Sequence, residues 1–120
     1  MKRDLAVVRG LLIEIEEIPS DGSFGYDQSK QGLSRPDFDE YVRLLEMEGF
    51  VHGVIGTLEY GSAQCEGLTP RGHDYLDKVR SETIWNAVVE KAKASGVALT
   101  ISAAYALAKV TIEEKLGIKL

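Results

Sequence analysis

The sequence is poor in cysteine and in long uncharged hydrophobic runs. Its 120 residues include one cysteine, Cys65, so the chain cannot form a disulfide within itself, which fits a reducing cytoplasm. The longest uncharged run, residues 94–108, contains four polar or glycine positions and is shorter than the roughly 18 apolar residues of a membrane span. The N-terminal segment carries glutamates where a signal peptide has an uncharged core. We therefore expect a cytoplasmic protein without membrane contact.

Basic residues are also few and scattered. The formal net charge is −5, and Lys2 and Arg3 are the only adjacent basic pair. Nucleic-acid-binding proteins usually carry a basic face, because most of their non-specific affinity comes from neutralising phosphates. The overall charge therefore counts against DNA binding, although it leaves room for a local basic patch.

Motifs of catalysis and metal binding are missing as well. The sequence contains no glycine-rich phosphate loop, no GxSxG motif and no carboxylate arrangement typical of an active site. His52, Cys65 and His73 are the soft metal ligands of the chain, and no two of them lie at CxxC, HxxH or HExxH spacing. Strand pairing could bring His52 near Cys65, but a half-buried histidine and a small apolar cysteine are the simpler interpretation. We expect neither enzymatic activity, nor a cofactor, nor a metal site.

The first helix that the sequence predicts covers residues 3–18. Asp4 can cap its start, apolar residues recur at helical spacing, and Pro19 ends it. Its acidic residues are expected to face solvent: Glu14, Glu16 and Glu17. Residues 19–33 then form a loop, with a short strand expected around residues 23–27. A complete helix-turn-helix would place a second short helix here, but the loop shows no apolar periodicity for one. Either that helix is reduced to a turn or the motif is degenerate.

The helix over residues 35–48 has the clearest end signals in the chain. Ser34 can accept a hydrogen bond from the first turn, and a proline stands in that turn, where its missing N–H does no harm. Gly49 is placed for a left-handed ending in which Phe50 packs back on Leu45. These signals predict both ends of the helix from local sequence.

A β-hairpin and a further helix are expected next. Residues 50–56 predict one strand, a turn is expected near Gly61–Ser62, and a second strand ends at Leu68. Thr69–Pro70 then opens a helix with a cap and a proline at the first position. Gly72 lies one turn into that helix, where a glycine indicates close approach to another backbone.

The C-terminal third predicts two more helical segments. Residues 81–83 form either a kink or the cap of a separate helix over residues 82–94. The last helix covers residues 100–116, and its first half is apolar on more than one side, which indicates burial on more than one side. We therefore expect this helix to pair with a second copy of the chain, through residues Ile101, Tyr105, Ala108 and Ile112.

Two features resemble known families. The segments LLEMEGF and LTPRGHDYLD, followed by Trp85, resemble a family of small bacterial and prophage proteins of unknown function. The order of helix, glycine, strand, hairpin and LTPRG is also similar to winged-helix regulators of the multiple-antibiotic-resistance and phenolic-acid-repressor type. This resemblance implies that the helix over residues 35–48 is a recognition helix and that the hairpin is a wing.

The resemblance also implies a fold class, which is mostly α with a small β-hairpin. We expect a single winged helix-turn-helix-like domain over residues 1–120. Its core would cover residues 1–80, and residues 81–120 would form a helical extension that serves oligomerisation.

The charges of the predicted recognition helix fit DNA poorly. Residues 35–49 hold two basic and five acidic side chains, whereas recognition helices normally carry Arg, Lys, Asn or Gln. The residues expected to contact a partner protein are Asp39, Glu40, Glu46 and Met47, and the candidates for DNA contact are Lys30, Arg35, Arg43 and Arg71. We therefore expect a non-catalytic interaction or adaptor protein of phage or mobile-element origin that forms a homodimer. The alternative is a dimeric winged-helix DNA-binding transcriptional regulator.

Overall fold

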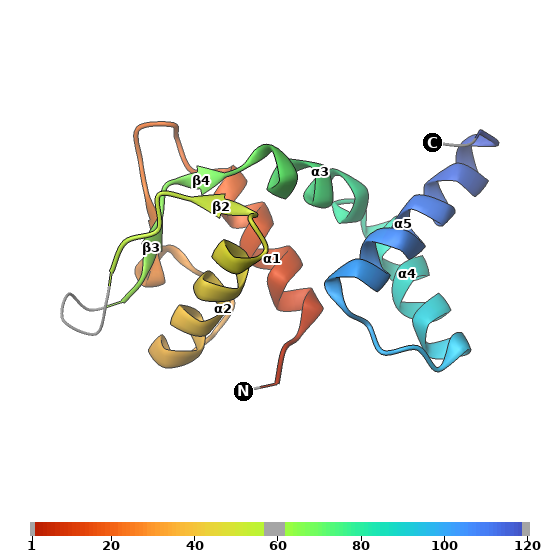
Figure 1. Ribbon diagram of the computed structural model, residues 1–120, viewed down its shortest axis with the longest axis horizontal. Helices are drawn as coiled ribbons and strands as arrows, with labels where there is room; N and C mark the ends of the chain where they lie inside the picture. The colour runs from red at the N-terminus through yellow and green to blue at the C-terminus, as the bar shows by residue number, and fades with distance from the viewer. Residues whose placement is uncertain (1, 57–61, 119–120) are drawn as a thin grey trace. The chain divides into compact units, whose positions relative to one another are not determined.

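The computed structural model describes residues 2–56 and 62–118 and confirms a mostly α-helical chain with a small antiparallel β element (Figure 1). The elements in chain order are α1 (Leu5–Glu16), β1 (Phe24–Gly25), the 3₁₀ turn η1 (Tyr26–Gln28), α2 (Arg35–Met47), β2 (Val51–His52), β3 (Gln64–Cys65), β4 (Gly67–Leu68), α3 (Pro70–Val79), α4 (Glu82–Ser95) and α5 (Ile101–Leu116). The chain divides into two compact units, residues 1–73 and 74–120.

Helix α1 supplies much of the core of the first unit. The side chain of Asp4 caps it by accepting a hydrogen bond from the Ala6 N–H at 2.9 Å, as the sequence predicts. The helix ends two residues earlier than expected, at Glu16. Five apolar side chains on one face are buried: Leu5, Val8, Leu11, Leu12 and Ile15.

Helix α2 begins and ends as the sequence predicts. The hydroxyl oxygen of Ser34 accepts a hydrogen bond from the Asp37 N–H at 3.3 Å. Gly49 has a φ of +74°, which glycine adopts without steric cost. The Phe50 N–H donates to the Leu45 carbonyl at 2.8 Å, which is the six-to-one hydrogen bond of a Schellman ending.

The four short strands form two antiparallel sheets of two strands each. Strand β2 pairs antiparallel with β4, with Val51 opposite Leu68, and an isolated bridge joins Ile55 to Gln64. Strand β1 pairs antiparallel with β3, with Phe24 opposite Cys65. The short strand expected around residues 23–27 is therefore confirmed, and the 3₁₀ turn η1 follows it within the predicted loop. Of the predicted turn near Gly61–Ser62, residue 61 lies outside the described residues.

The start of α3 is held tightly against the end of α2. The side chain of Thr69 bonds the Gly49 carbonyl, and its backbone N–H donates to the Phe50 carbonyl at 2.9 Å. A Cβ added to Gly72 would lie 2.1 Å from the Phe50 carbonyl oxygen. The predicted close approach at Gly72 is therefore confirmed, because only a residue without a side chain fits there.

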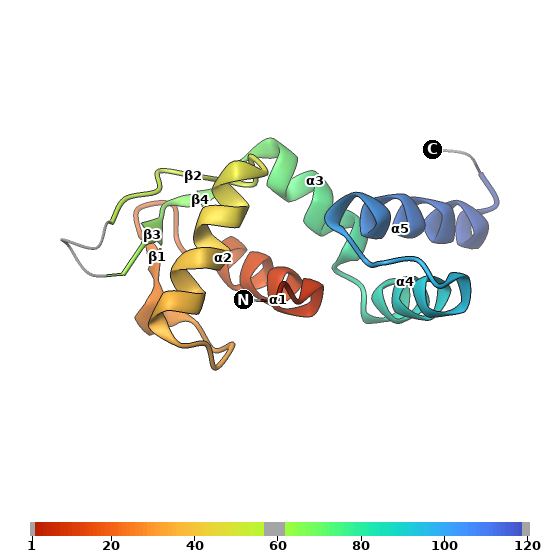
Figure 2. The same cartoon turned by 60° about the horizontal axis from the view of Figure 1, so that its bottom comes forward.

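The second unit contains two packed helices, α4 and α5, which lie side by side in Figures 1 and 2. Ser81 caps α4 by accepting from the Ile84 N–H at 3.4 Å, so residues 81–83 start a separate helix and do not form a kink. Thr100 caps α5 by accepting from the Ala103 N–H at 3.0 Å. Left-handed glycines end both helices: Gly96 and Gly117.

Candidate functional site

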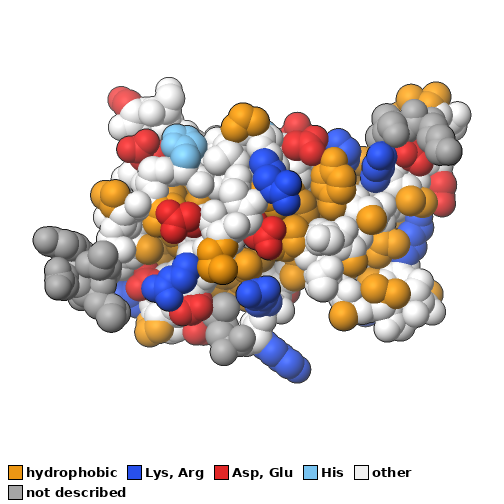
Figure 3. Space-filling view, in the orientation of Figure 1, with side chains coloured by type: hydrophobic (Ala, Val, Ile, Leu, Met, Phe, Trp, Pro, Cys, Tyr) orange, Lys and Arg blue, Asp and Glu red, His pale blue; other side chains and the backbone are white. Residues whose placement is uncertain are grey.

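The exposed face of α2 carries one large apolar side chain among charged ones. Met47 is 76% exposed, which is unusual for a large apolar residue in a chain with a well-buried core. The Arg43 guanidinium lies 3.7 Å from the Glu40 carboxylate, and both side chains are mostly exposed. Glu46 is also exposed. Figure 3 shows acidic, basic and apolar side chains interspersed over α2 on the face in view, with no basic patch on that face.

Asp39 has a different role from the one expected. One of its carboxylate oxygens accepts hydrogen bonds from the Ser62 hydroxyl at 2.7 Å and from the Ala63 N–H at 2.8 Å. One oxygen of the side chain therefore anchors the chain as it returns toward β3. The sequence gives no signal for this contact, because its members lie more than 20 residues apart.

The basic residues proposed for DNA contact do not gather in one place. The Arg35 guanidinium lies 4.9 Å from the centre of the Tyr26 ring, at the first residue of α2. Arg71 donates from Nε to the Glu48 carbonyl at 2.8 Å, just past the last residue of the same helix. These two arginines mark opposite ends of a 13-residue helix, which is about 20 Å long.

Lys30 lies in a loop that α1 holds in place. The Glu14 carboxylate accepts hydrogen bonds from the Gln31 amide at 2.7 Å and from the Lys30 N–H at 3.2 Å. The expectation that the glutamates of this helix simply face solvent is therefore wrong for Glu14. The same Gln31 amide fills the position of a side chain at Gly10, because a Cβ added there would lie 2.6 Å from it.

Each histidine lies beside a carboxylate, and the cysteine is buried. His52 Nδ1 lies 3.7 Å from the Glu66 carboxylate, and His73 Nδ1 lies 3.5 Å from the Glu16 carboxylate. Cys65 is buried, and desolvation raises the pKa of its thiol to about 11, so it stays protonated and unreactive at neutral pH. No group of three metal-ligating side chains occurs among residues 2–56 and 62–118.

In the second unit, one side of α5 packs against the rest of that unit. Ala104, Ala108 and Thr111 are buried, and the Lys91 ammonium of α4 donates to the Thr111 hydroxyl at 2.9 Å. Ala108 therefore belongs to the packing of this unit and is not exposed to a second copy, whereas Ile101 and Ile112 stay partly exposed.

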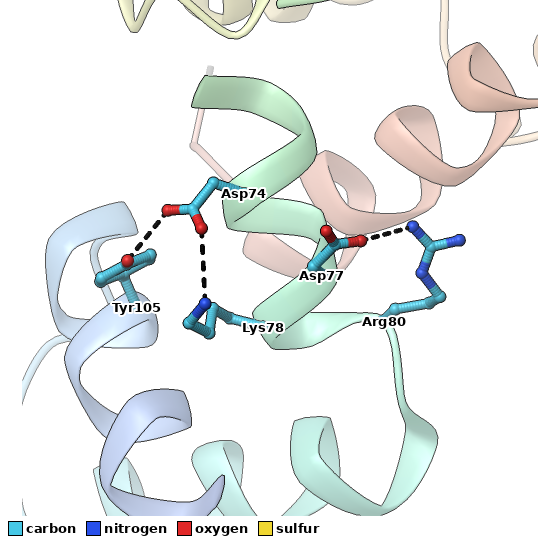
Figure 4. A network of polar contacts seen from close by, with 5 residues as sticks. All are labelled: Asp74, Asp77, Lys78, Arg80 and Tyr105. Atoms are coloured by element: carbon cyan, nitrogen blue, oxygen red, sulfur yellow. Dashed lines mark hydrogen bonds and ion pairs between the residues drawn. The ribbon is translucent and has the colours of Figure 1, made fainter. Parts of the chain in front are cut away.

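Tyr105 is partly exposed and joins α5 to α3 (Figure 4). Its hydroxyl donates to the Asp74 carboxylate at 2.9 Å, and the Lys78 ammonium lies 3.4 Å from the other oxygen. These contacts, the tyrosine hydrogen bond foremost, lower the pKa of Asp74. On the same helix Asp77 accepts from the Arg80 guanidinium at 2.9 Å.

The solvent side of α5 exposes apolar residues that the sequence did not single out as an interface. Val110 is 45% exposed and Leu116 is 60% exposed, and Ile118 beyond the helix is also exposed. Val110 lies away from the buried stripe of Ala104 and Ala108. In the sequence, only the spacing of Val110 from those two alanines indicates that it lies on the solvent side of the helix.

These features define a small, mostly helical protein with two small antiparallel sheets of two strands each and a partly apolar C-terminal helix. The chain belongs to the hypothetical protein family DUF2513, whose model matches residues 2–98. The predicted resemblance to a family of proteins of unknown function is therefore confirmed. None of the described helices is long and apolar enough to cross a membrane.

Comparison with individual proteins adds one relative. The chain is 26% identical over 125 residues to a protein of Haemophilus influenzae (strain ATCC 51907 / DSM 11121 / KW20 / Rd) described as uncharacterized, and the match covers 98% of this chain and 100% of the relative. No solved structure matches the chain significantly.

Proposed function

We propose that this chain is a non-catalytic interaction protein on a winged-helix scaffold, and that it presents the exposed face of α2 to a partner protein. The order of elements supports the scaffold. Helix α1, strand β1, the turn η1, helix α2 and the hairpin follow one another as in a winged helix whose second helix has shrunk to one turn. In such a scaffold α2 takes the position of the recognition helix.

The exposure of Met47 among acidic side chains carries the proposal. Methionine is enriched in protein interfaces, and an exposed thioether offers an apolar contact that adapts to its partner. The single arginine in the middle of the face, Arg43, lies beside Glu40, so its charge is partly neutralised. Because Glu46 adds a further negative charge, the face suits a basic protein surface better than a phosphate backbone.

A photo-crosslinking amino acid in place of Met47, introduced in the host cells, tests this interface. We expect a discrete protein adduct that the additional change Glu46→Lys abolishes. The matched control places the crosslinker at the exposed Asn86 of α4, where no adduct of the same mass is expected. An adduct with DNA at position 47, or the same protein adduct at both positions, would contradict the proposal.

We further propose that two copies pair through the solvent side of α5. Ala106, Val110 and Glu113 recur on this side at helical spacing. An antiparallel pairing centred between Lys109 and Glu113 would bring each lysine opposite the glutamate of the second copy. That charge complementarity favours a second copy as the partner, because one surface then supplies both signs.

A dimeric DNA-binding regulator is the second candidate. The winged-helix order and the exposed side chains of Lys30, Arg35, Arg43 and Arg71 favour it. Binding of duplex DNA that weakens with salt and is lost on Arg43→Glu would support this candidate over the protein interface.

A further inference from the structure

A polar recess lies beside the N-terminal end of α2, within the first unit. It has a volume of about 220 Å³, which is below the roughly 300–1,000 Å³ of pockets that take drug-sized ligands or cofactors. The recess can therefore hold a small chemical group. Residues of η1, α2 and β3 line it, together with Ser23, Gly25 and Ser62.

Two amide side chains in the recess have their oxygens already occupied. The Gly25 N–H donates a hydrogen bond to Gln28 Oε1 at 2.8 Å. The side-chain nitrogen of Gln28 is therefore the end that can donate to a ligand. The Ser23 hydroxyl similarly lies 3.5 Å from Gln64 Oε1 and donates to it. Since each amide has one accepting and one donating end, both glutamines keep donors that bond no other residue of the described chain.

A guanidinium adds a positive charge to these donors. Arg35 stacks over the Tyr26 ring, with 4.9 Å between its central carbon and the ring centre, and pairs with no carboxylate among residues 2–56 and 62–118. Stacking on an aromatic ring restricts the guanidinium and leaves its edge N–H groups available. Asp27 is the one acidic residue in the lining, so the local charge is balanced before a ligand binds.

We propose that this recess binds a single phosphate group. Arg35, Gln28 and Gln64 offer donors from three different elements, and a tetrahedral oxyanion can accept from several directions, whereas a carboxylate offers only two oxygens in one plane. Charge-assisted hydrogen bonds from a guanidinium are the strongest part of such recognition. The inference goes beyond the proposed function, because neither the exposed face of α2 nor the pairing of α5 requires a phosphate site.

An NMR titration of the labelled full chain with inorganic phosphate, at ionic strength held constant with sodium chloride, tests the recess. We expect saturable shifts of the side-chain amides of Gln28 and Gln64 and of Arg35 Nε. Arg35→Gln should weaken binding by about tenfold or more, because it removes the charge-assisted bonds. Arg43→Gln is the matched control, since it removes the same charge from the same helix, and it should leave the affinity within about twofold.

Two further arms sharpen the result. Gln64→Leu removes a donor without changing α2 and should also weaken binding, which keeps the test valid if Arg35→Gln perturbs the helix. Dimethyl phosphate identifies the source of the group: binding equal to that of inorganic phosphate indicates a diester, and weaker binding indicates a free or terminal phosphate. Shifts that do not saturate, that acetate reproduces, or that survive Arg35→Gln in a folded variant would overturn the inference.

Discussion

Asp39 shows how one carboxylate can serve the structure within a face that otherwise looks free. Its two hydrogen bonds, to the Ser62 hydroxyl and the Ala63 N–H, connect α2 to the segment leading into β3. We expect Asp39→Ala to lower the free energy of unfolding by about 1–3 kcal/mol, because both donors lose a charged acceptor. Urea denaturation measures the change.

The matched control for that substitution is Glu40→Ala on the same helix. Glu40 has an exposed side chain that pairs only with Arg43 among the described residues, so its removal should change stability by no more than about 0.5 kcal/mol. Equal losses for the two variants would mean that the hydrogen bonds of Asp39 contribute little.

The contact between Tyr105 and Asp74 predicts a pH dependence. In the folded state, the tyrosine hydroxyl lowers the pKa of Asp74 below its ordinary value of 3.8. The ionised carboxylate therefore stabilises the fold above pH 3.8, and this contribution is lost as the pH falls through the lowered folded-state value.

We expect Tyr105→Phe to be less stable than the wild-type chain at pH 7, and the difference to shrink below pH 3.8. Thermal unfolding between neutral and acidic pH measures both. A difference that stays constant through the acidic range would show that the hydroxyl does not act through the ionised carboxylate.

At the scale of elements, helix ends were predictable and long-range contacts were not. Ser34, Gly49, Thr100 and Gly117 fix their helix ends through hydrogen bonds or φ values within a few residues, so the sequence near each end contains the information. The pairing of β1 with β3 joins residues about 40 apart. The hydrogen bonds from residues 30 and 31 to Glu14 of α1 join residues that are 16 and 17 apart. Single-sequence periodicity holds no signal for such pairs.

The candidate surfaces followed the same division. The exposure of Glu40, Glu46 and Met47 follows from helical spacing and was predicted from it. The burial of Ala108 was not, because an alanine fits either side of a helix and the position of α4 decides which side is covered. The recess beside α2 could not be predicted, because strand β3 forms part of its lining and only the tertiary structure determines which segments lie beside that strand.

Helix α5 carries the prediction on self-association. We expect the wild-type chain to sediment as a dimer at tens of micromolar, and Val110→Lys to raise the dissociation constant at least about tenfold, because a buried lysine at the centre of the pair must be desolvated. Asn86→Lys adds the same charge on the exposed side of α4 and should leave the dimer intact. A wild-type monomer, or equal effects of both variants, would argue against pairing through α5.

At the scale of the whole molecule, charge separates the two functional candidates. The chain has a net charge of −5, and its exposed basic residues at Arg35 and Arg71 mark opposite ends of α2. On the proposed winged-helix scaffold, this distribution would repel the phosphate backbone where a regulator would attract it. We therefore propose that α2 contacts a protein and not DNA.

The most direct test is a fluorescence-anisotropy titration of labelled duplex DNA of mixed sequence at about 50 mM salt, where phosphate contacts are strongest. We expect no saturable binding by the wild-type chain at tens of micromolar. The double variant Glu40→Lys with Glu46→Lys should gain binding that weakens between about 50 and 200 mM salt, because it turns the same face basic on the same scaffold. Saturable, salt-dependent binding by the wild-type chain, lost on Arg43→Glu, would contradict the central claim.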